Sequence, residues 1–425
     1  MTLENIYSLF LKSEGVSTDS REVPRDSLFF ALKGPNFNGN AYAEAALQKG
    51  AAFAVIDEEE FAVSDKTILV PDALKCLQEL GTHHRRQCKA TVIALTGSNG
   101  KTTTKELIAS VLSRQYNTMA TKGNLNNHIG VPLTLLRINP ETEMAVIEMG
   151  ANHQKEITFL SQLAEPDMGY ITNFGKAHLE GFGGIEGVIK GKSELYDYLK
   201  ASGNMIFLNA DDPIQREKLQ DYPKKTGFST TDPGYFVIED LGASPFVRLR
   251  VEGTTIQTQL SGGYNFSNCA IAVLMGKYFN IPLPEVKNAI ESYVPDNNRS
   301  QLLKKKDLEI ILDAYNANPS SMSVALRHLS ALNTPNKIAI LGDMFELGDE
   351  AGREHQAIAE LAQSLGFEQV LLIGKEFSVT KSHARCFPDF ESLAAYLNAS
   401  PLQGPATVLI KASRGMALER VLDVL

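Results

Sequence analysis

One segment of this 425-residue chain limits its fold more than any other. The apolar run 92–95 leads into Thr96-Gly97-Ser98-Asn99-Gly100-Lys101-Thr102, and a helical pattern follows. The two glycines let backbone N–H groups turn toward an anion, and the N-terminus of the helix contributes the positive end of the helix dipole. The segment therefore predicts a nucleoside triphosphate site, with Lys101 reaching the outer phosphates and Thr102 holding magnesium.

This loop is shorter than the usual phosphate-binding loop, because Leu95 stands where that motif has its first glycine. An ordinary turn between a strand and a helix is the alternative interpretation. The strand before the loop and the helix after it both favour the phosphate site. The ATP contacts that we assign to the loop are Gly97, Ser98, Asn99, Gly100, Lys101, Thr102 and Thr103.

Length and composition narrow the class of protein. A chain of this length is expected to form two or three domains. Hydrophobic residues make up 43% and charged residues 21%, which is typical of globular proteins. We find no membrane span and no signal peptide, so we expect a cytoplasmic protein. The four cysteines lack the spacing of disulfides or a zinc site, and a net charge of -9 argues against nucleic acid as a partner.

The elements fall into three blocks, at 1–86, 87–299 and 300–425. The first block has strand-like runs at 27–32 and 52–56, which indicate a small α/β domain. In the second, strands alternate with helices and a β-rich piece follows at 235–260, which predicts a central, mainly parallel sheet of the phosphate-loop type, covered by helices. The third repeats the rhythm and predicts a Rossmann-like α/β domain.

The strands and helices that define the second and third blocks are predicted from apolar runs of matching length. In the second block the strands are at 91–95, 144–147, 169–172 and 205–208, and the helices are at 101–112, 154–163 and 185–199. In the third block the strands are at 308–312, 337–341, 369–373 and 407–410.

Polar residues follow many of these strands, at the sheet edge where open α/β folds bind ligands. Glu148 ends a buried strand and is a candidate magnesium ligand, although an acid there could instead cap the next helix. His178 follows another strand; most loop histidines bind nothing, but its position at the same edge favours a role as a ligand. In the third block, helix capping is the alternative to ligand binding. The corresponding residues there are Asp313, Asp343, Lys375 and the run 411–414.

Several motifs together resemble the central domain of the Mur ligases of peptidoglycan synthesis. These are the loop 96–102, Glu148-Met149-Gly150, Asn173 with His178, and Lys192-Ser193-Glu194-Leu195-Tyr196. Other segments extend the likeness to all three blocks. They are Thr18-Asp19-Ser20-Arg21, Phe29-Phe30-Ala31-Leu32-Lys33-Gly34, Gly123-Asn124-Leu125-Asn126-Asn127-His128-Ile129-Gly130-Val131-Pro132, Asp313-Ala314-Tyr315-Asn316-Ala317-Asn318-Pro319-Ser320-Ser321-Met322 and Leu341-Gly342-Asp343-Met344-Phe345-Glu346-Leu347-Gly348.

The resemblance implies an ATP-driven amide ligase whose substrates are UDP-N-acetylmuramoyl-tripeptide and D-alanyl-D-alanine. In the family, the substrate carboxylate attacks the γ-phosphate of ATP, and the amine of the incoming group then displaces phosphate from the acyl phosphate. The catalytic residues that match the family are Lys101, Glu148, His178 and Lys192. The implied ligands of two magnesium ions are Thr102, Glu148, His178 and Lys192, the last carbamylated by carbon dioxide.

Further site residues are carried over from the family. Asn265 and Asn268 match the adenine segment, and Arg299 and Asp313 match other ATP contacts. Ser20, Arg21 and Lys33 are expected to hold the uridine diphosphate. Candidates for the muramyl peptide, the dipeptide or the transferred phosphate are Asn126, Asn127, Tyr315, Asn316, Asn318, Lys411, Ser413 and Arg414. The chain departs from the family pattern at His128, where an acid is common, and at Asn40, where a histidine is common.

Four alternatives remain. A sister ligase that adds the third amino acid would carry Asp-Asn-Pro-Arg, which does not occur in the sequence. A folate-type ligase would lack the uridine-nucleotide domain, a plain kinase or ATPase would not need the third block, and a binding-only relative would have lost the catalytic residues. We expect a monomer whose second and third domains close on their ligands. The third residue of the tripeptide, diaminopimelate or lysine, is left open.

Overall fold

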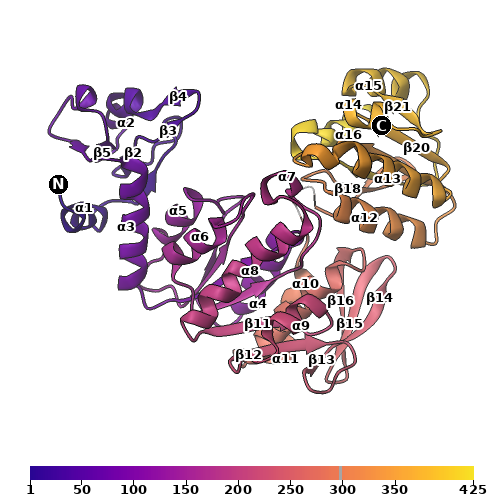
Figure 1. Cartoon of the computed structure of the whole chain (residues 1–425), viewed down its shortest axis with the longest axis horizontal. Helices are drawn as coiled ribbons and strands as arrows, with labels where there is room; N and C mark the ends of the chain where they lie inside the picture. Colours follow the sequence, from indigo (N-terminus) through magenta and orange to yellow (C-terminus); the bar gives the residue numbers. More distant parts are fainter. Residues whose placement is uncertain (296–298) are drawn as a thin grey trace.

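Three α/β domains follow one another along the chain in the computed structural model, which describes residues 1–295 and 299–425. The N-terminal and C-terminal domains lie on opposite sides of the central one (Figure 1). Residues 296–298, next to the predicted boundary at 299, lie outside the described residues.

The N-terminal domain is built on a parallel sheet with the strand order β1-β2-β5-β6. Its central strand β2 is buried along its whole length, with Leu28 and Phe30 packing against one cluster and Phe29 against another. This alternation sandwiches the sheet between helices. The elements are β1 (Val16–Ser17), β2 (Leu28–Phe30), β5 (Phe53–Ile56), β6 (Thr67–Leu69), the hairpin β3 (Lys33–Gly34) and β4 (Phe37–Asn38), and the helices α1 (Leu3–Phe10), α2 (Ala43–Gln48) and α3 (Ala73–Gln87).

The central domain has a seven-stranded parallel sheet with the order β13-β12-β11-β10-β7-β9-β8. Alternate residues of β7 are buried on opposite faces, Val92 in one cluster and Ile93 in another, so helices cover both sides. The strands are β7 (Thr91–Thr96), β8 (Thr118–Ala120), β9 (Met144–Glu148), β10 (Met168–Ile171), β11 (Met205–Asn209), β12 (Lys225–Ser229) and β13 (Phe236–Val237). The helices are α4 (Lys101–Leu112), α5 (Gly130–Leu135), α6 (Glu156–Ala164), α7 (Leu179–Phe182), α8 (Ile185–Ala201), α9 (Pro213–Leu219), α10 (Asn265–Tyr278) and α11 (Leu283–Ser292).

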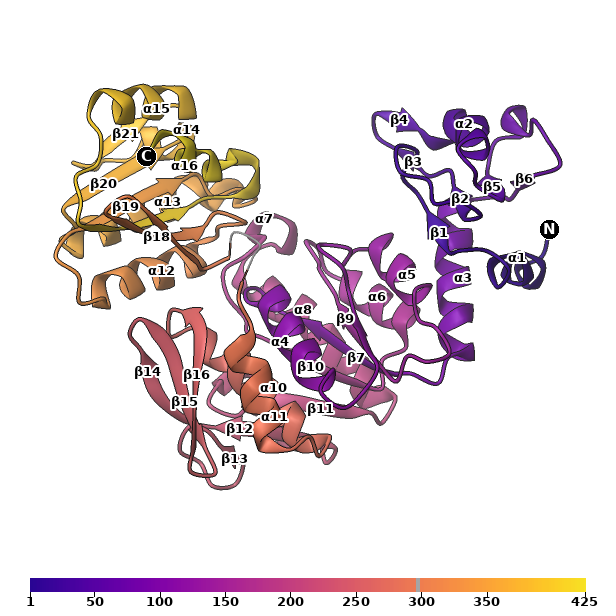
Figure 2. The ribbon, with the colours of Figure 1, turned by 180° about the vertical axis from the view of Figure 1, so that it is seen from behind.

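Most of the β-rich piece predicted at 235–260 forms a separate antiparallel sheet. It consists of β14 (Glu239–Ala243), β15 (Phe246–Val251) and β16 (Thr254–Ser261). Along β15, Val247, Leu249 and Val251 are buried while the residues between them are more exposed, as expected for a strand with one solvated face. Figure 2 shows this sheet beside α10, on the side facing the C-terminal domain.

The C-terminal domain has a six-stranded sheet with the order β17-β18-β22-β19-β20-β21, in which only the edge strand β17 is antiparallel among the described residues. The strands are β17 (Gln301–Lys305), β18 (Leu308–Asp313), β19 (Lys337–Gly342), β20 (Gln369–Ile373), β21 (Arg385–Phe387) and β22 (Ala406–Lys411). The main helices are α12 (Pro319–Ala331), α13 (Ala351–Ser364), α14 (Lys375–Ser378), α15 (Phe390–Ala399) and α16 (Val421–Val424). Each strand predicted for this domain lies within one residue of the observed one.

Helix α3, which the sequence analysis did not identify, joins the N-terminal domain to the central one. Near its end, the buried guanidinium of Arg85 donates to the backbone oxygens of Ala164 and Glu165, both at 3.1 Å, and to the Asp167 carboxylate at 2.8 Å. The Asp167 carboxylate also accepts from the backbone N–H of Val92 at the start of β7. Arg85 therefore fixes the helix to the central sheet. In the described part of the chain, no helix is long and apolar enough to cross a membrane.

We expect Arg85→Met to lower the free energy of unfolding by ~2–3 kcal/mol, because the backbone oxygens of Ala164 and Glu165 lose a donor and the Asp167 carboxylate loses its ion pair. The neighbouring Arg86 is exposed and pairs with the Glu165 carboxylate at 2.6 Å. Arg86→Met is the matched control and should cost less than ~1 kcal/mol. Urea unfolding of both variants checks this, and equal losses would contradict the role given to Arg85.

Candidate active site

A cavity of about 1040 Å³ lies between the central and C-terminal domains. Its wall combines the phosphate loop, the ends of β9 and β10, the start of α10, and the loops that follow β18, β19 and β22. Most of the side chains predicted for ATP, dipeptide and metal line it. The residues concerned are Ser98, Asn99, Gly100, Lys101, Thr102, Thr103, Asn126, Asn127, Glu148, His178, Asn265, Asn268, Arg299, Asp313, Tyr315, Asn316, Asn318, Lys411, Ser413 and Arg414.

The phosphate loop depends on its two glycines. Gly97 has φ +143°, and a Cβ there would lie 1.9 Å from the hydroxyl of Thr172, so this position packs against β10 rather than facing the cavity. Gly100 has φ +77° and directly precedes α4. The ammonium of Lys101 turns back to donate to the backbone oxygen of Gly97 at 2.8 Å. The loop thus keeps its lysine at the positive end of a helix.

Burial and two neighbouring charges shift the pKa of Lys101. Burial lowers this pKa, the carboxylate of Glu148 acts to raise it, and the positive charge of Arg299 lowers it further. A nearby anion would favour the charged lysine. The electrostatics of the loop therefore suit a polyanionic ligand.

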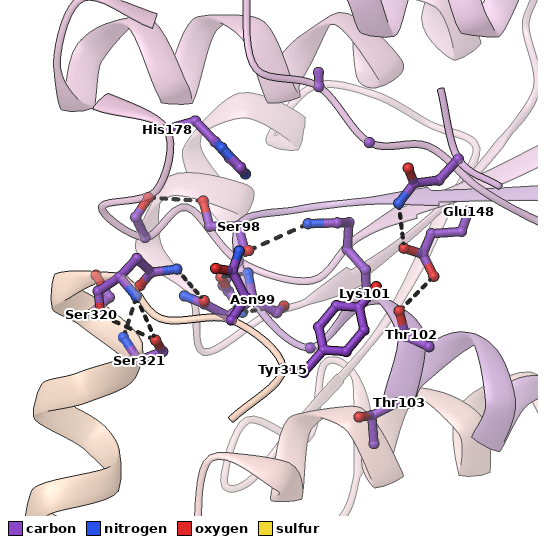
Figure 3. A pocket seen from close by; sticks show the side chains of 18 of the residues that line it. Ser98, Asn99, Lys101, Thr102, Thr103, Glu148, His178, Tyr315, Ser320 and Ser321 are labelled. Carbon is purple, nitrogen blue, oxygen red and sulfur yellow. Dashed lines mark hydrogen bonds between the residues drawn. The ribbon is translucent and has the colours of Figure 1, made fainter. Parts of the chain in front are cut away.

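Glu148 is the last residue of β9 and is 2% exposed. Its carboxylate accepts from the Thr102 hydroxyl at 2.9 Å, as Figure 3 shows beside Lys101, and from the Asn126 amide at 2.8 Å. The next helix, α6, begins at Glu156 after Lys155, so the alternative that Glu148 caps this helix is wrong. Carboxylate and hydroxyl oxygens are the hard ligands that magnesium takes, and these two groups fit such an ion.

His178 and Lys192 lie apart from this pair of oxygen ligands. Nδ1 of His178 contacts the carboxylate of Glu346 in the C-terminal domain. The buried ammonium of Lys192 donates to the backbone oxygen of Ala151 at 2.9 Å and lies 5.0 Å from the ring centre of Phe182, outside the cavity wall. Among the described residues, no group of three or more His, Cys, Asp and Glu is placed to hold a metal ion.

Burial governs the chemistry of Lys192. Desolvation places its pKa well below the usual lysine value, and the positive charge of Lys101 lowers it further, against the carboxylates of Glu156 and Glu194. The side chain is therefore more often a neutral amine than an exposed lysine is.

The two asparagines predicted to contact adenine form hydrogen bonds with nearby residues of the protein. The amide of Asn265 donates to the backbone oxygen of Ser261 at 2.8 Å, and the amide of Asn268 donates to the side-chain oxygen of Asn265 at 2.8 Å. The hydroxyl of Thr104 in α4 donates to the Asn268 oxygen at 3.0 Å. Asn268 thereby connects α10 to the helix of the phosphate loop.

The turn between β18 and α12 carries the predicted contacts of the third domain. The Arg299 guanidinium stacks on the ring of Tyr315, with its central carbon 3.7 Å from the ring centre. Asn318 caps α12 and donates a hydrogen bond from its amide to the side chain of Asn99 in the phosphate loop, at 2.7 Å. This turn therefore contacts the phosphate loop directly.

Residues that the sequence analysis did not select also join the two domains. The hydroxyl of Ser320 accepts from the backbone N–H of Lys176 at 2.8 Å, and the Lys176 ammonium pairs with the Glu354 carboxylate at 2.7 Å. Ser320 and Glu346 lie in motifs quoted above, so position in the motif was the available signal. Lys176 and Glu354 carried no such signal.

Two of the residues expected at the ligand-binding edge of the C-terminal sheet, Asp343 and Lys375, lie away from the cavity. Asp343 accepts from the backbone N–H groups of Glu376 and Phe377, each at 3.0 Å, and so takes the helix-capping alternative at α14. Lys375 is exposed on the first turn of that helix. Both lie outside the cavity wall, because the β19–β20 side of the sheet closes on its own helix.

The three residues expected to hold uridine diphosphate lie in the N-terminal domain, outside this cavity. Arg21 pairs with Asp19 at 2.7 Å on the surface, and the backbone oxygen of Ser20 accepts from the ammonium of Lys49. Lys33 lies 3.0 Å from Asp57.

The two departures from the family pattern have different surroundings. The buried amide of Asn40 exchanges hydrogen bonds with Asp57, at 2.8 and 2.9 Å, and so supports the N-terminal domain. His128 lines the cavity.

Comparison with protein families agrees with this architecture. Residues 95–276 match the Mur ligase middle domain, residues 298–414 match the Mur ligase, glutamate ligase domain, and residues 12–85 match the Mur ligase family, catalytic domain. The chain therefore belongs to the Mur ligase family, and the resemblance predicted from its motifs is confirmed.

Individual relatives show which members of the family this chain resembles. The chain is 34% identical to the UDP-N-acetylmuramoyl-tripeptide–D-alanyl-D-alanine ligase of Bacillus subtilis (strain 168), over 96% of this chain and 92% of that protein. The protein of the same name from Escherichia coli (strain K12) is 32% identical, over 97% and 93%. Among solved structures, MurF from Acinetobacter baumannii has a TM-score of 0.85 at 30% identity, over 96% of this chain and 92% of that one. MurF ligase from Thermotoga maritima in complex with ADP has a TM-score of 0.84 at 28% identity, over 98% and 97%. These structures confirm the predicted three-domain α/β fold.

We expect Gly97→Ala to weaken ADP binding by about a hundredfold or more, since the added Cβ would overlap Thr172 and the φ of this position disfavours alanine. Gly352→Ala in α13 is the control, because a Cβ there meets open space. Calorimetric titration with ADP measures both affinities. Wild-type affinity in Gly97→Ala would contradict the loop geometry.

Proposed function

We propose that this chain joins D-alanyl-D-alanine to UDP-N-acetylmuramoyl-tripeptide at the expense of ATP, releasing ADP and phosphate. The observation that carries the proposal is the cavity in which the phosphate loop of the central domain faces the turn 313–318 of the C-terminal domain. The full-length likeness to ligases of that name supports the choice of substrates. The proposal places the enzyme in the cytoplasm, as a monomer.

The reaction begins with two anions that repel each other, the tripeptide carboxylate and the γ-phosphate of ATP. Lys101 lies on the phosphate loop, where its ammonium can leave the Gly97 oxygen for a phosphate oxygen. Thr102 and Glu148 would hold magnesium, which supplies further positive charge to the phosphates. The carboxylate oxygen attacks phosphorus, ADP leaves, and the dipeptide amine then attacks the acyl carbon of the acyl phosphate and expels phosphate.

The remaining residue roles belong to the proposal. Gly97, Ser98, Asn99, Gly100 and Thr103 would form the phosphate loop, with Asn265, Asn268, Arg299 and Asp313 on the nucleoside side. For the muramyl peptide and the dipeptide the assigned residues are Asn126, Asn127, Tyr315, Asn316, Asn318 and Arg414, and Lys411 and Ser413 belong to the same cavity wall. Ser20, Arg21 and Lys33 would hold the uridine diphosphate. We keep the domain boundaries that were predicted from the sequence, at residues 86 and 299.

We further propose that Lys192 is carbamylated and that, with His178, it helps to hold a second magnesium ion. A carbamate forms when a neutral amine attacks carbon dioxide and loses a proton, and the lowered pKa of Lys192 favours that amine. The modification would replace a buried cation with an anion. His178 would have to leave Glu346 to take part, which fits a site completed by movement of the C-terminal domain.

The test of the main proposal is phosphate release from Mg·ATP with UDP-N-acetylmuramoyl-tripeptide present. We expect phosphate release to require D-alanyl-D-alanine, because ligands must occupy the parts of the cavity that both domains contribute. The product should have the mass of the matching pentapeptide. Diaminopimelate, lysine and glutamate serve as competing acceptors. Release with a single amino acid would instead indicate a sister ligase, and release regardless of acceptor would indicate an ATPase.

For Lys192 we expect a carbamate carbon signal in NMR spectra of the protein equilibrated with ¹³C-bicarbonate. The signal should vanish in Lys192→Arg and persist in Lys190→Arg, a matched control on the exposed face of the same helix. Uptake should fall as the pH is lowered toward the pKa of Lys192, because protonation removes the nucleophile. A signal unchanged in Lys192→Arg would refute the modification at this residue.

A further inference from the structure

Lys411 was carried over from the family as a contact of the dipeptide or the phosphate, but its surroundings indicate another role. It ends β22 and lies directly beside Asp313, which ends the parallel strand β18. Its ammonium donates to the Asp313 carboxylate at 2.6 Å, to the Asp313 backbone oxygen at 3.5 Å and to the Asn316 backbone oxygen at 3.0 Å. The side chain of Lys411 is 2% exposed, although the residue is part of the cavity wall.

These contacts use the whole hydrogen-bonding capacity of the side chain. A lysine ammonium has three donors, and three oxygens of the turn 313–316 accept from it. A phosphate or carboxylate of a ligand could bind Lys411 only by displacing one of them. We propose that Lys411 is a positioning residue that fixes the turn 313–318, and that it acts on the ligands through this turn.

The turn 313–318 carries several groups that face the nucleotide side of the cavity. Tyr315 stacks on Arg299, and Asn318 donates to Asn99 of the phosphate loop. The Asp313 carboxylate, held by Lys411, also accepts from the backbone N–H of Ser300 at 3.4 Å. One buried ammonium therefore connects the end of β22 to contacts on both domains.

Two other residues of the run 411–414 differ in whether their side chains already bind within the turn. Ser413 is 1% exposed; its hydroxyl accepts from the backbone N–H of Phe345 at 2.9 Å and donates to the backbone oxygen of Ala317 at 3.3 Å. The side chain of Arg414, by contrast, is 60% exposed and pairs with Glu419 at the surface. Of these three predicted contacts, Arg414 has the side chain that can reach a ligand without breaking the turn.

The inference rests on the proposed nucleotide site, so the experiment measures ADP binding directly. A double-mutant cycle compares Lys411→Met, Asp313→Asn and the double variant by calorimetric titration. We expect each single variant to weaken ADP binding about tenfold and the double variant also about tenfold, because two residues acting as one unit are not additive. A lysine that touched the nucleotide by itself would give about a hundredfold loss in the double variant. That additive result would overturn the inference.

Three further measurements keep the test decisive. Lys375→Met, an exposed lysine at the start of α14 on the same sheet, should leave ADP affinity unchanged. Lys411→Gln, which keeps a donor for Asp313, should recover part of the affinity, and it replaces Lys411→Met in the cycle if thermal unfolding shows that Lys411→Met is not folded. No recovery in Lys411→Gln would count against the role. Failure of the wild-type protein to bind ADP would overturn the nucleotide site itself, an outcome distinct from additive losses.

Discussion

The parallel pairing of β7 with β9 and β10 is the constraint on which the rest of the site depends. Leu95 pairs with Glu148 on one side, and Thr96 pairs with Ile171 on the other. This register brings the phosphate loop, the Glu148 carboxylate and the loop after β10 to one edge of the sheet, where open α/β folds bind ligands. The hydroxyl of Thr102, on the first turn of α4, then meets Glu148 without any irregular backbone in the strand. The two oxygens suited to magnesium therefore follow from strand register and helix position.

The electrostatics of the cavity complement this geometry. Lys101 and Arg299 place positive charge around the loop, and the charge of Arg299 disfavours the charged form of Lys101. The carboxylate of Glu148 offsets part of this repulsion. A bound triphosphate would remove the remainder, so the same charges that weaken one another in the free protein would strengthen its binding. The hydrogen bond from Lys101 to the Gly97 oxygen satisfies the ammonium in the free protein and can be exchanged for a phosphate oxygen.

Much of this fold could be predicted from the sequence, because strands buried on both faces are continuous apolar runs. The helix α4 and the strand β20 have the predicted bounds. Helix α3 was missed although its buried residues Ala73, Cys76, Leu77 and Leu80 have the spacing of one helix face. The contact of Asn99 with Asn318 could not be predicted from periodicity, since it joins side chains from two separate sheets. It depends on how the domains lie against each other, which no local pattern encodes.

Asp313 and Asp343 show why the chemistry of a sheet edge depends on strand order. Both acids come at the end of a buried parallel strand and are equivalent in sequence terms. The neighbour of Asp313 in the sheet is Lys411, so its carboxylate is held as one member of an ion pair in the cavity wall. The carboxylate of Asp343 instead accepts hydrogen bonds from backbone N–H groups in the first turn of α14, the helix that follows the neighbouring strand β20. Asp343 lies outside the cavity wall. The order β18-β22-β19-β20 decides between the two outcomes, and this order becomes visible when the strands are assembled into a sheet.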